Sequence, residues 1–407
     1  MRTHMSRLII ASLTVACWAA AAGCADTDTT EQWRGTVISV DRVAGYTASE
    51  VRDRLAGFGS GTGAVASGVD TFRVVYRTPG VDRRPTTASG LLALPRRDSR
   101  TLTLVSYGHG TTSVRSDVPS RSTDEWATAP VLTYAAAGFA AAAPDYLGLG
   151  DSPGRHPWMD VGTESSASLD LLRASRTVIG RNGESVRPGV MVTGFSQGAS
   201  AAMGVARALD DREDGYLRLR AVAPVSGAYA LRAVQIPAML AGRVDERMAV
   251  IYTAYLLSAW NQVYGGIYTD PTQMFASPYA HRIDGYFSGD TAGAVMVAGL
   301  PGTLDALLTP RATDLLRHPV GALARALDRA DSVCDGWRPS APVRLFAMDG
   351  DEQAVTANTD RCAASLTSAG ARVTRTNLPT ASYETSRHLG SNRDALGPIV
   401  EWFAGMR

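Results

Sequence analysis

The feature that most constrains the fold is an alternation of short apolar runs with longer amphipathic stretches. The apolar runs, each bounded by Gly, Pro or polar residues, span residues 102–107, 138–144, 189–194, 220–225, 343–347 and 371–376. Helical patterns lie between and after them, at 125–137, 164–179, 197–210, 359–368 and 392–403. This alternation predicts a mostly parallel, doubly wound sheet with helices on both faces. Residues 36–40 and 71–94 are predicted to add antiparallel strands.

One long stretch interrupts the alternation. Between residues 228 and 337 the helical patterns are at 244–264, 304–316 and 320–330, and no convincing strand separates them. We therefore predict a helical cap at 228–337, inserted into one α/β core that comprises residues 36–227 and 338–407. A chain of 407 residues could hold more domains, but one enlarged domain fits equally well.

The first residues have the pattern of an export signal. Arg2 and Arg7 precede the apolar run 8–22, which is too short for a stable membrane span. We predict a signal peptide at 1–23 and a polar tether at 24–35. Ala21-Ala22-Gly23-Cys24 resembles a bacterial lipobox, which would place a lipid on Cys24. The protein is expected to be exported, either as a cell-envelope lipoprotein anchored to the membrane or as a secreted protein.

The remaining cysteines point to a disulfide. Cys17 lies in the signal, so Cys334 and Cys362 are the pair left for an oxidising compartment. Two free buried thiols are the alternative. Zinc-type spacing of Cys and His is absent, and no metal or other cofactor is predicted.

Composition excludes several classes of protein. Hydrophobic residues make up 45% of the chain, too many for a disordered protein. The 40 basic residues balance 39 acidic ones without runs of one sign, which argues against a nucleic-acid partner. All the basic residues are Arg, so no catalytic Lys is available for a Schiff base or a phosphate-binding loop.

Two serines match the nucleophile-elbow pattern G-x-S-x-G, and local chemistry separates them. Ser152 is followed by Pro153, which has no N–H for an oxyanion and disfavours helix before it. Ser196 follows the apolar run 189–194 and opens an Ala-rich helical stretch, as an elbow requires. We predict Ser196 as the nucleophile and Ser152 as a turn residue.

A serine nucleophile needs a base and an acid that orients the base. His388 lies after the last predicted strand and before the terminal helix, where the base of such a triad belongs. The acid should follow the strand 343–347. Asp351 is favoured, Asp349 and Glu352 are alternatives, and either aspartate could simply cap the next helix.

The tetrahedral oxyanion needs backbone donors. The N–H of Gln197 is one candidate, and the N–H of Gly110 or Thr111, in a Gly-rich turn after the strand 102–107, is the second. His109 is expected to hold this turn rather than to act as the base.

Four motifs together resemble the α/β-hydrolases of the secretory-lipase type. They are Tyr107-Gly-His-Gly-Thr-Thr112, Pro144-Asp-Tyr-Leu-Gly-Leu-Gly-Asp-Ser152, Gly194-Phe-Ser-Gln-Gly198 and Asp351-Glu-Gln353. The resemblance spans roughly residues 70–407 and implies lipases or esterases with a helical cap inserted between late strands. This sequence departs from the pattern after Gln353, where Ala-Val-Thr stands in place of the expected Val-Pro.

These observations predict a serine carboxylic-ester hydrolase that acts through an acyl-enzyme on uncharged, apolar acyl esters, without a cofactor. A small-molecule or lipid ester is the expected substrate, and the membrane is a partner through the N-terminal lipid. The alternatives are a peptidase, amidase or acyltransferase with the same triad, or a non-catalytic lipoprotein binding module. The sequence leaves the oligomeric state open.

Overall fold

A computed structural model describes residues 32–97 and 100–407. The predicted signal peptide, Cys24 and most of the predicted tether lie outside these residues. The strands are β1 (Val37–Tyr46), β2 (Gly68–Pro79), β3 (Pro85–Arg96), β4 (Thr101–Gly108), β5 (Ala140–Pro144), β6 (Ser185–Phe195), β7 (Arg218–Val225), β8 (Val343–Met348) and β9 (Val373–Leu378).

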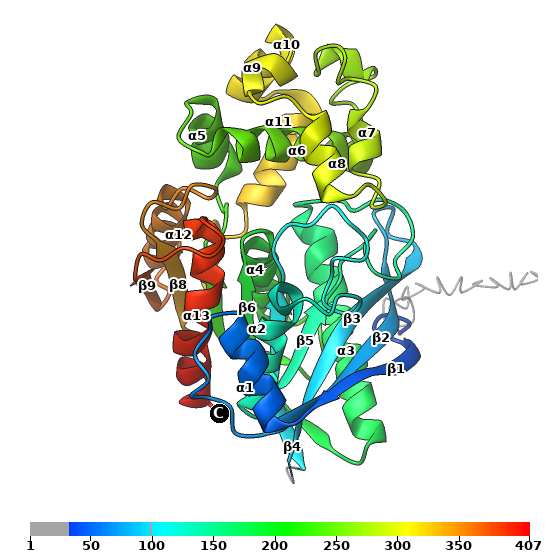
Figure 1. Cartoon of the computed structure of the whole chain (residues 1–407), viewed down its shortest axis with the longest axis vertical. Helices are drawn as coiled ribbons and strands as arrows, with labels where there is room; N and C mark the ends of the chain where they lie inside the picture. The colour runs from blue at the N-terminus through cyan, green and yellow to red at the C-terminus, as the bar shows by residue number, and fades with distance from the viewer. Residues whose placement is uncertain (1–31, 98–99) are drawn as a thin grey trace, which may run out of the picture. The chain divides into compact units, whose positions relative to one another are not determined.

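These strands form one sheet in the order β1-β2-β3-β5-β4-β6-β7-β8-β9 (Figure 1). β1, β2, β3 and β5 pair antiparallel, and every pairing from β5 through β4 to β9 is parallel. The predicted mostly parallel α/β sheet is therefore confirmed. Because parallel strands end at the same edge, the loops after β4, β6 and β8 all open toward one end of the molecule.

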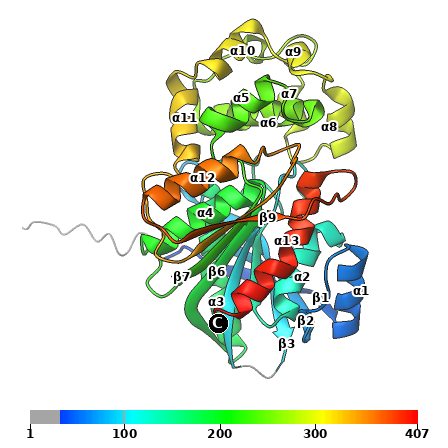
Figure 2. The same ribbon diagram turned by 90° about the vertical axis from the view of Figure 1, so that its left-hand side faces the viewer.

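Helices cover both faces of the sheet (Figure 2). One face packs against α3 (Val161–Arg181), α4 (Gln197–Asp210) and α12 (Ala357–Ser368), and the other against α1 (Ala48–Gly57), α2 (Glu125–Ala136) and α13 (Arg387–Ala404). Successive side chains of a strand point to opposite faces, so buried Leu104 joins the first cluster and its neighbour Val105 the second. This double burial explains why β4 to β8 read as nearly continuous apolar runs.

The chain between β7 and β8 is helical and contributes no strand to the sheet; all of its residues are described. It contains η1 (Leu231–Gln235), α5 (Ile236–Leu240), α6 (Glu246–Tyr264), η2 (Pro271–Gln273), α7 (Ile283–Tyr286), α8 (Gly293–Gly299), α9 (Leu304–Leu307), α10 (Pro310–Arg317) and α11 (Gly321–Asp331). These elements gather beyond the carboxyl edge of the sheet, at the top of Figure 1. They share a hydrophobic cluster around fully buried Trp260.

The predicted helix 304–316 is wrong, because the structure divides it into α9 and α10. Pro310 disfavours helical geometry at the preceding residue, and Thr309 instead caps α10 by accepting a hydrogen bond from the Ala312 N–H at 3.2 Å. Helix α1 was not predicted. Its signal was present, since Thr47 and Glu50 form a capping box at its start.

Cys334, just after α11, is bonded to Cys362 in α12. The predicted disulfide therefore ties the end of the helical segment to the core. Among the described residues, no helix combines the length and apolar character needed to span a membrane.

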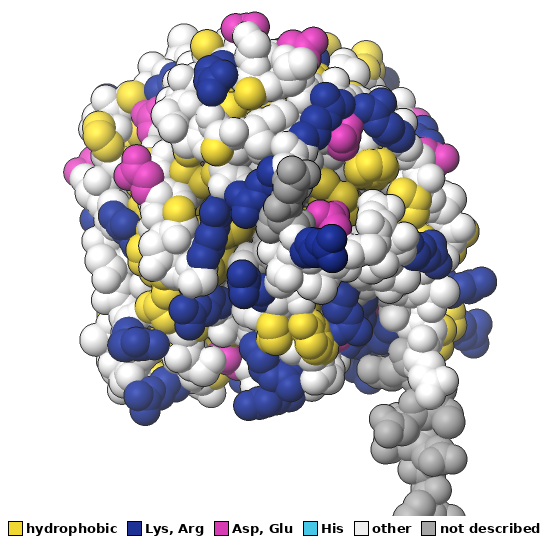
Figure 3. All heavy atoms as spheres, turned by 90° about the horizontal axis from the view of Figure 1, so that it is seen from below, with side chains coloured by type: hydrophobic (Ala, Val, Ile, Leu, Met, Phe, Trp, Pro, Cys, Tyr) yellow, Lys and Arg dark blue, Asp and Glu magenta, His cyan; other side chains and the backbone are white. Residues whose placement is uncertain are grey.

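Arginines are scattered over the end of the molecule farthest from the helical segment (Figure 3). Two of them have structural contacts there: the Arg220 guanidinium donates to the Met406 carbonyl at 2.9 Å, and Arg407 donates to the Ala137 carbonyl. The Arg407 guanidinium also lies over the Phe139 ring, 4.0 Å from its centroid. These side chains satisfy main-chain carbonyls and stack on aromatic rings, both ordinary roles for arginine.

Candidate active site

Ser196 occupies a strained turn between β6 and α4. Its φ of 56° and ψ of −118° lie outside the regions that a residue with a side chain prefers. The turn is tight enough that a Cβ at Gly194 would come within 2.1 Å of the Gly198 carbonyl oxygen. Glycine is therefore required there, and the turn holds the serine at the carboxyl edge of the sheet.

His388 lies against Ser196 and Asp351. Its Nε2 is 2.8 Å from Ser196 Oγ, and its Nδ1 is 2.8 Å from Asp351 Oδ2. Both side chains are almost fully buried, at 2% exposure for His388 and 1% for Asp351. With a proton on Nδ1 donated to the carboxylate, the lone pair of Nε2 faces the serine hydroxyl, which is the arrangement for proton abstraction.

The three candidate acids have different surroundings in the structure. Asp351 Oδ1 accepts hydrogen bonds from the N–H groups of Gln353 and Ala354 at 2.9 and 2.8 Å, which fixes the carboxylate toward His388. Asp349 is exposed and accepts from the Asn377 side chain at 2.7 Å. Glu352 faces the start of α13, where it accepts from the N–H groups of Arg387 and His388. Only Asp351, of these three, contacts the imidazole.

The predicted oxyanion donors are the backbone N–H groups of Gln197 and of Gly110 or Thr111. Gln197 is the first residue of α4, and N–H groups in the first turn of a helix have no partner within the helix. Among the described residues, the N–H groups of Gly110 and Thr111 likewise have no hydrogen-bond acceptor. Thr111 and Gln197 line the same cavity as Ser196 and His388. Residues of two different loops, each with a backbone N–H that could serve as an oxyanion donor, therefore border the cavity next to the serine.

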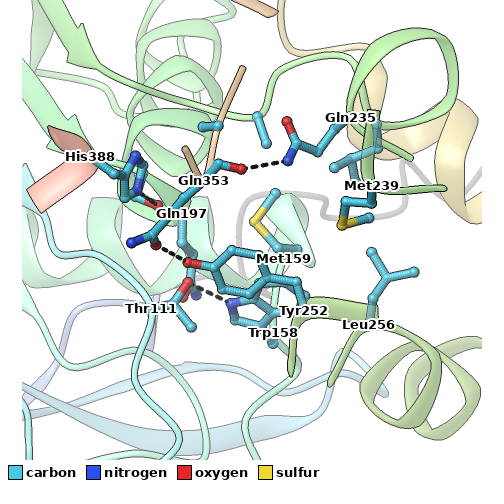
Figure 4. A pocket seen from close by; sticks show the side chains of 14 residues that line it. Thr111, Trp158, Met159, Gln197, Gln235, Met239, Tyr252, Leu256, Gln353 and His388 are labelled. Carbon is cyan, nitrogen blue, oxygen red and sulfur yellow. Dashed lines mark hydrogen bonds between the residues drawn. The ribbon is translucent and has the colours of Figure 1, made fainter. Parts of the chain in front are cut away.

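A mostly apolar cavity opens next to Ser196 and reaches into the helical segment. Core residues Trp158 and Met159 form one side (Figure 4), and Trp158 is fixed by donating its Nε1–H to Thr111 Oγ1 at 3.0 Å. Met239 of α5 and Leu256 of α6 lie at the end away from His388. The sequence predicts a helical cap at 228–337 but does not identify the side chains that line this cavity.

Hydrogen bonds tie the helical segment to the loop that carries Asp351. The Tyr252 hydroxyl donates to Gln353 Oε1 at 2.5 Å, and Gln235 Nε2 donates to the Gln353 carbonyl at 2.6 Å (Figure 4). Glu352 adds a third link, because its carbonyl accepts from the Asp245 N–H at 2.7 Å. These hydrogen bonds therefore connect the helical part of the cavity wall to the loop that carries Asp351, which we call the acid loop.

The second serine motif has a structural role. Ser152 lies in a turn and is 3% exposed, and its N–H donates to the Leu149 carbonyl. His109 is buried as well, with Nδ1 2.7 Å from the Gly110 carbonyl oxygen. Burial lowers the pKa of His109 to about 4, so the imidazole is neutral, and it lies against its own loop rather than beside the serine.

Comparison with solved structures gives extensive matches. The rice cell wall degrading esterase LipA from Xanthomonas oryzae is 25% identical, with a TM-score of 0.81 over 92% of this chain and 100% of that chain. A putative hydrolase from Legionella pneumophila is 22% identical, with a TM-score of 0.82 over 91% of this chain and 98% of that one. Candida antarctica lipase A is 14% identical, with a TM-score of 0.62 over 86% of this chain and 77% of that one.

No protein-family model and no curated protein matches the sequence. The structural matches span both parts of the sheet and the helical segment between them, since they cover nearly the whole of this chain. Together with the strand order and the strained serine turn, they show the fold. The chain has the α/β-hydrolase fold, which it shares with these esterases and lipases.

Proposed function

We propose that the protein is a serine carboxylic-ester hydrolase of the esterase or lipase type. One observation carries the proposal: Ser196 Oγ, the His388 imidazole and the Asp351 carboxylate form a continuous hydrogen-bonded series at the mouth of an apolar cavity. The esterase and lipase activities of the structural neighbours support the same reaction class. No step of the proposed reaction calls for a metal or an organic cofactor.

In the proposed reaction, His388 Nε2 accepts the proton of Ser196 while Oγ attacks the ester carbonyl. The N–H of Gln197, with that of Gly110 or Thr111, stabilises the negative oxygen of the tetrahedral intermediate. His388 then returns the proton to the departing alkoxide, which leaves an acyl-serine and a free alcohol. Water, deprotonated by the same imidazole, attacks the acyl-serine. The imidazolium then protonates Ser196 Oγ as it leaves, which releases the carboxylic acid and restores the serine hydroxyl. Asp351 stabilises the imidazolium that forms in both halves.

The acyl group would enter the apolar cavity. Its lining of Trp, Met and Leu side chains suits an uncharged chain and disfavours a charged one, whose desolvation would not be compensated. In this proposal, the segment 228–337 acts as a cap that completes the acyl site. The substrate class is therefore an ester of an apolar carboxylic acid.

A fluorophosphonate probe and a series of 4-nitrophenyl esters test the proposal. We expect the probe to label the purified protein once per chain, and Ser196→Ala to abolish both labelling and ester hydrolysis. Ser152→Ala is the matched control, because it alters the other serine of the same pattern, and it should be labelled like wild type. Unlabelled wild-type protein, or equal labelling of Ser196→Ala, would contradict the proposal.

We also propose that the protein is exported and that Cys24 carries a lipid. The disulfide between Cys334 and Cys362 supports an oxidising compartment. Expression in a bacterial host with radiolabelled palmitate should label the wild-type chain and leave Cys24→Ala unlabelled. Label on both proteins, or on neither, would contradict lipidation at this cysteine.

A further inference from the structure

The side chain that follows the nucleophile is held in a buried polar cluster. Gln197 is 2% exposed, and its Nε2 donates to His156 Nε2 at 2.7 Å and to Glu164 Oε1 at 2.6 Å. His156 accepts that bond, so its proton is on Nδ1, which donates to the Leu147 carbonyl at 2.8 Å. Both N–H groups of the Gln197 side-chain amide therefore donate hydrogen bonds, and these bonds hold the end of the side chain in place.

Glu164 connects this cluster to the cavity wall. Its Oε1 also accepts from the N–H of Met159 at 3.0 Å, and the carboxyl group is 1% exposed at the start of α3. Within the described residues, Glu164 Oε2 has no hydrogen-bond partner. A buried carboxyl group that forms no ion pair and orders both the elbow and the cavity wall has a positioning role.

The Gly110-Thr111 turn, which carries the second proposed oxyanion donor, is held by Tyr146. Like His156, Tyr146 lies in the segment after β5. Tyr146 lies between the two buried histidines, with its ring centroid 4.5 Å from that of His109 and 5.8 Å from that of His156. Its hydroxyl donates to the His109 carbonyl at 3.4 Å. Tyr146 is fully buried and has a φ of 69°, a strained conformation that its surroundings must maintain.

We infer that His109, Tyr146, His156 and Glu164 form a positioning cluster that fixes both halves of the proposed oxyanion hole. The cluster positions the N–H of Gln197 by holding the Gln197 side chain. It positions the Gly110-Thr111 turn, the other half, by holding His109. This inference rests on the proposed function. It also assigns a role to the Pro144–Ser152 motif, which supplies Tyr146 and Leu147 to the cluster.

The cluster functions in a neutral state. Burial lowers the pKa of His156 to about 3 and raises that of Glu164 to about 8. Groups that face Glu164 are His156 and Tyr146 from the segment after β5, Asp160 at the start of α3, and Tyr255 of α6. None is cationic at neutral pH. An ionised Glu164 therefore brings an uncompensated negative charge toward the developing oxyanion, and kcat should fall as the carboxyl group ionises.

The test compares Glu164→Leu with Glu164→Gln on a short-chain ester. Loss of the acceptor in Glu164→Leu should lower kcat about tenfold or more with KM little changed, because the donors act on the transition state. Glu164→Gln supplies an amide oxygen in place of Oε1 and should recover most of that loss. It should also lack the decline in kcat near pH 8 that wild type shows. Glu401→Leu and Glu401→Gln, on the exposed side of α13, are the matched controls.

His156→Phe is a second variant, in case Glu164→Leu does not fold. It keeps an aromatic ring against Tyr146 but removes the acceptor for Gln197, and it should lower kcat and the affinity for a boronic-acid transition-state analogue by similar factors. Wild-type kcat in folded Glu164→Leu and His156→Phe, or an unchanged alkaline profile in Glu164→Gln, would overturn the inference. Failure of the proposed function is distinguishable, because wild-type protein would then not hydrolyse the ester.

Discussion

The Tyr252 hydroxyl of helix α6 donates to Gln353 Oε1 at 2.5 Å, and Gln353 is two residues from Asp351. This hydrogen bond connects the helical segment to the loop that orients His388. Gln353 Nε2 in turn donates to Ser386 Oγ at 3.2 Å, just before α13 begins. A change in the helical segment should therefore reach the imidazole through a short series of hydrogen bonds.

Tyr252→Phe should lower kcat on an acetyl ester about fivefold, because one buried hydrogen bond of about 1 kcal/mol is lost from the acid loop. An acetyl ester excludes effects on the far end of the cavity. Tyr286→Phe is the control, since its hydroxyl donates to the Gly299 carbonyl within the helical segment. Equal kcat values for Tyr252→Phe and wild type would show that the acid loop does not depend on this contact.

Asp351→Asn and Asp349→Asn form a matched pair around one loop. Asp351→Asn cannot hold the imidazole tautomer that presents a lone pair to Ser196, and kcat should fall about 10³–10⁴-fold. Asp349→Asn alters an exposed carboxylate that bonds Asn377 and should stay within about twofold of wild type. Steady-state kinetics at neutral pH decide the assignment, and the reverse ranking would make Asp349 the acid.

Filling the far end of the cavity should shorten the preferred acyl chain. Leu256→Trp adds a ring where Leu256 and Met239 close the cavity, so octanoyl esters should lose at least tenfold in kcat/KM while acetyl esters lose little. Val295→Trp, at an exposed position of the same helical segment, is the control. A uniform loss for all chain lengths in Leu256→Trp would mean that the acyl group lies elsewhere.

Removal of the disulfide should destabilise the fold without changing the chemistry. The bridge closes a sequence separation of 28 residues, which corresponds to about 3.6 kcal/mol in the chain-entropy model. The double variant Cys334→Ser, Cys362→Ser should unfold at lower urea concentration, and reductant should shift wild type in the same direction. Reductant should leave the double variant unchanged. An identical urea midpoint for wild type and variant would contradict this expectation.

The free energy of unfolding should depend on the ionisation of Glu164. The ordinary pKa of 4.5 applies in the unfolded chain, and burial raises it to about 8 in the folded protein. The stability linked to this group is therefore fully present below pH 4.5 and is lost as the pH rises toward about 8, by up to about 1.4 kcal/mol per pH unit. Glu164→Gln lacks this dependence. Urea unfolding measured between pH 5 and 8 should show that the free energy of unfolding of Glu164→Gln increases with pH relative to that of wild type.

Much of the fold was predictable because buried parallel strands and their helices leave strong local patterns. Helix Gln197–Asp210 has the bounds that its sequence predicts, and Ser196, Asp351 and His388 were placed by their positions after strands. Chain order alone could not separate Asp351 from Asp349. That distinction depends on the Gln353 and Ala354 N–H groups, which turn one carboxylate toward the imidazole.

The contacts that were not predicted join residues far apart in the chain. Residue 164 is only the first position of a predicted helical pattern, and neither Glu164 nor His156 carries a local sign of its bond to Gln197. The cavity lining depends on how α5 and α6 lie over the sheet edge, which no periodicity encodes. By contrast, the break before Pro310 and the capping box at Thr47 were readable locally and were missed.

The segment between β7 and β8 leaves and rejoins the sheet at neighbouring strands, and the Ser226 N–H donates to the Phe346 carbonyl at 2.9 Å where they meet. Insertions and deletions within it would therefore leave every strand pairing intact. In the proposed enzyme, substrate preference can change faster in evolution than the catalytic triad. The reason is that part of the cavity lining belongs to the inserted segment, whereas the triad belongs to the core. A segment exchanged for this one would have to retain hydrogen-bond partners for Gln353. Tyr252 and Gln235 are therefore the two positions of the segment that we expect to stay unchanged.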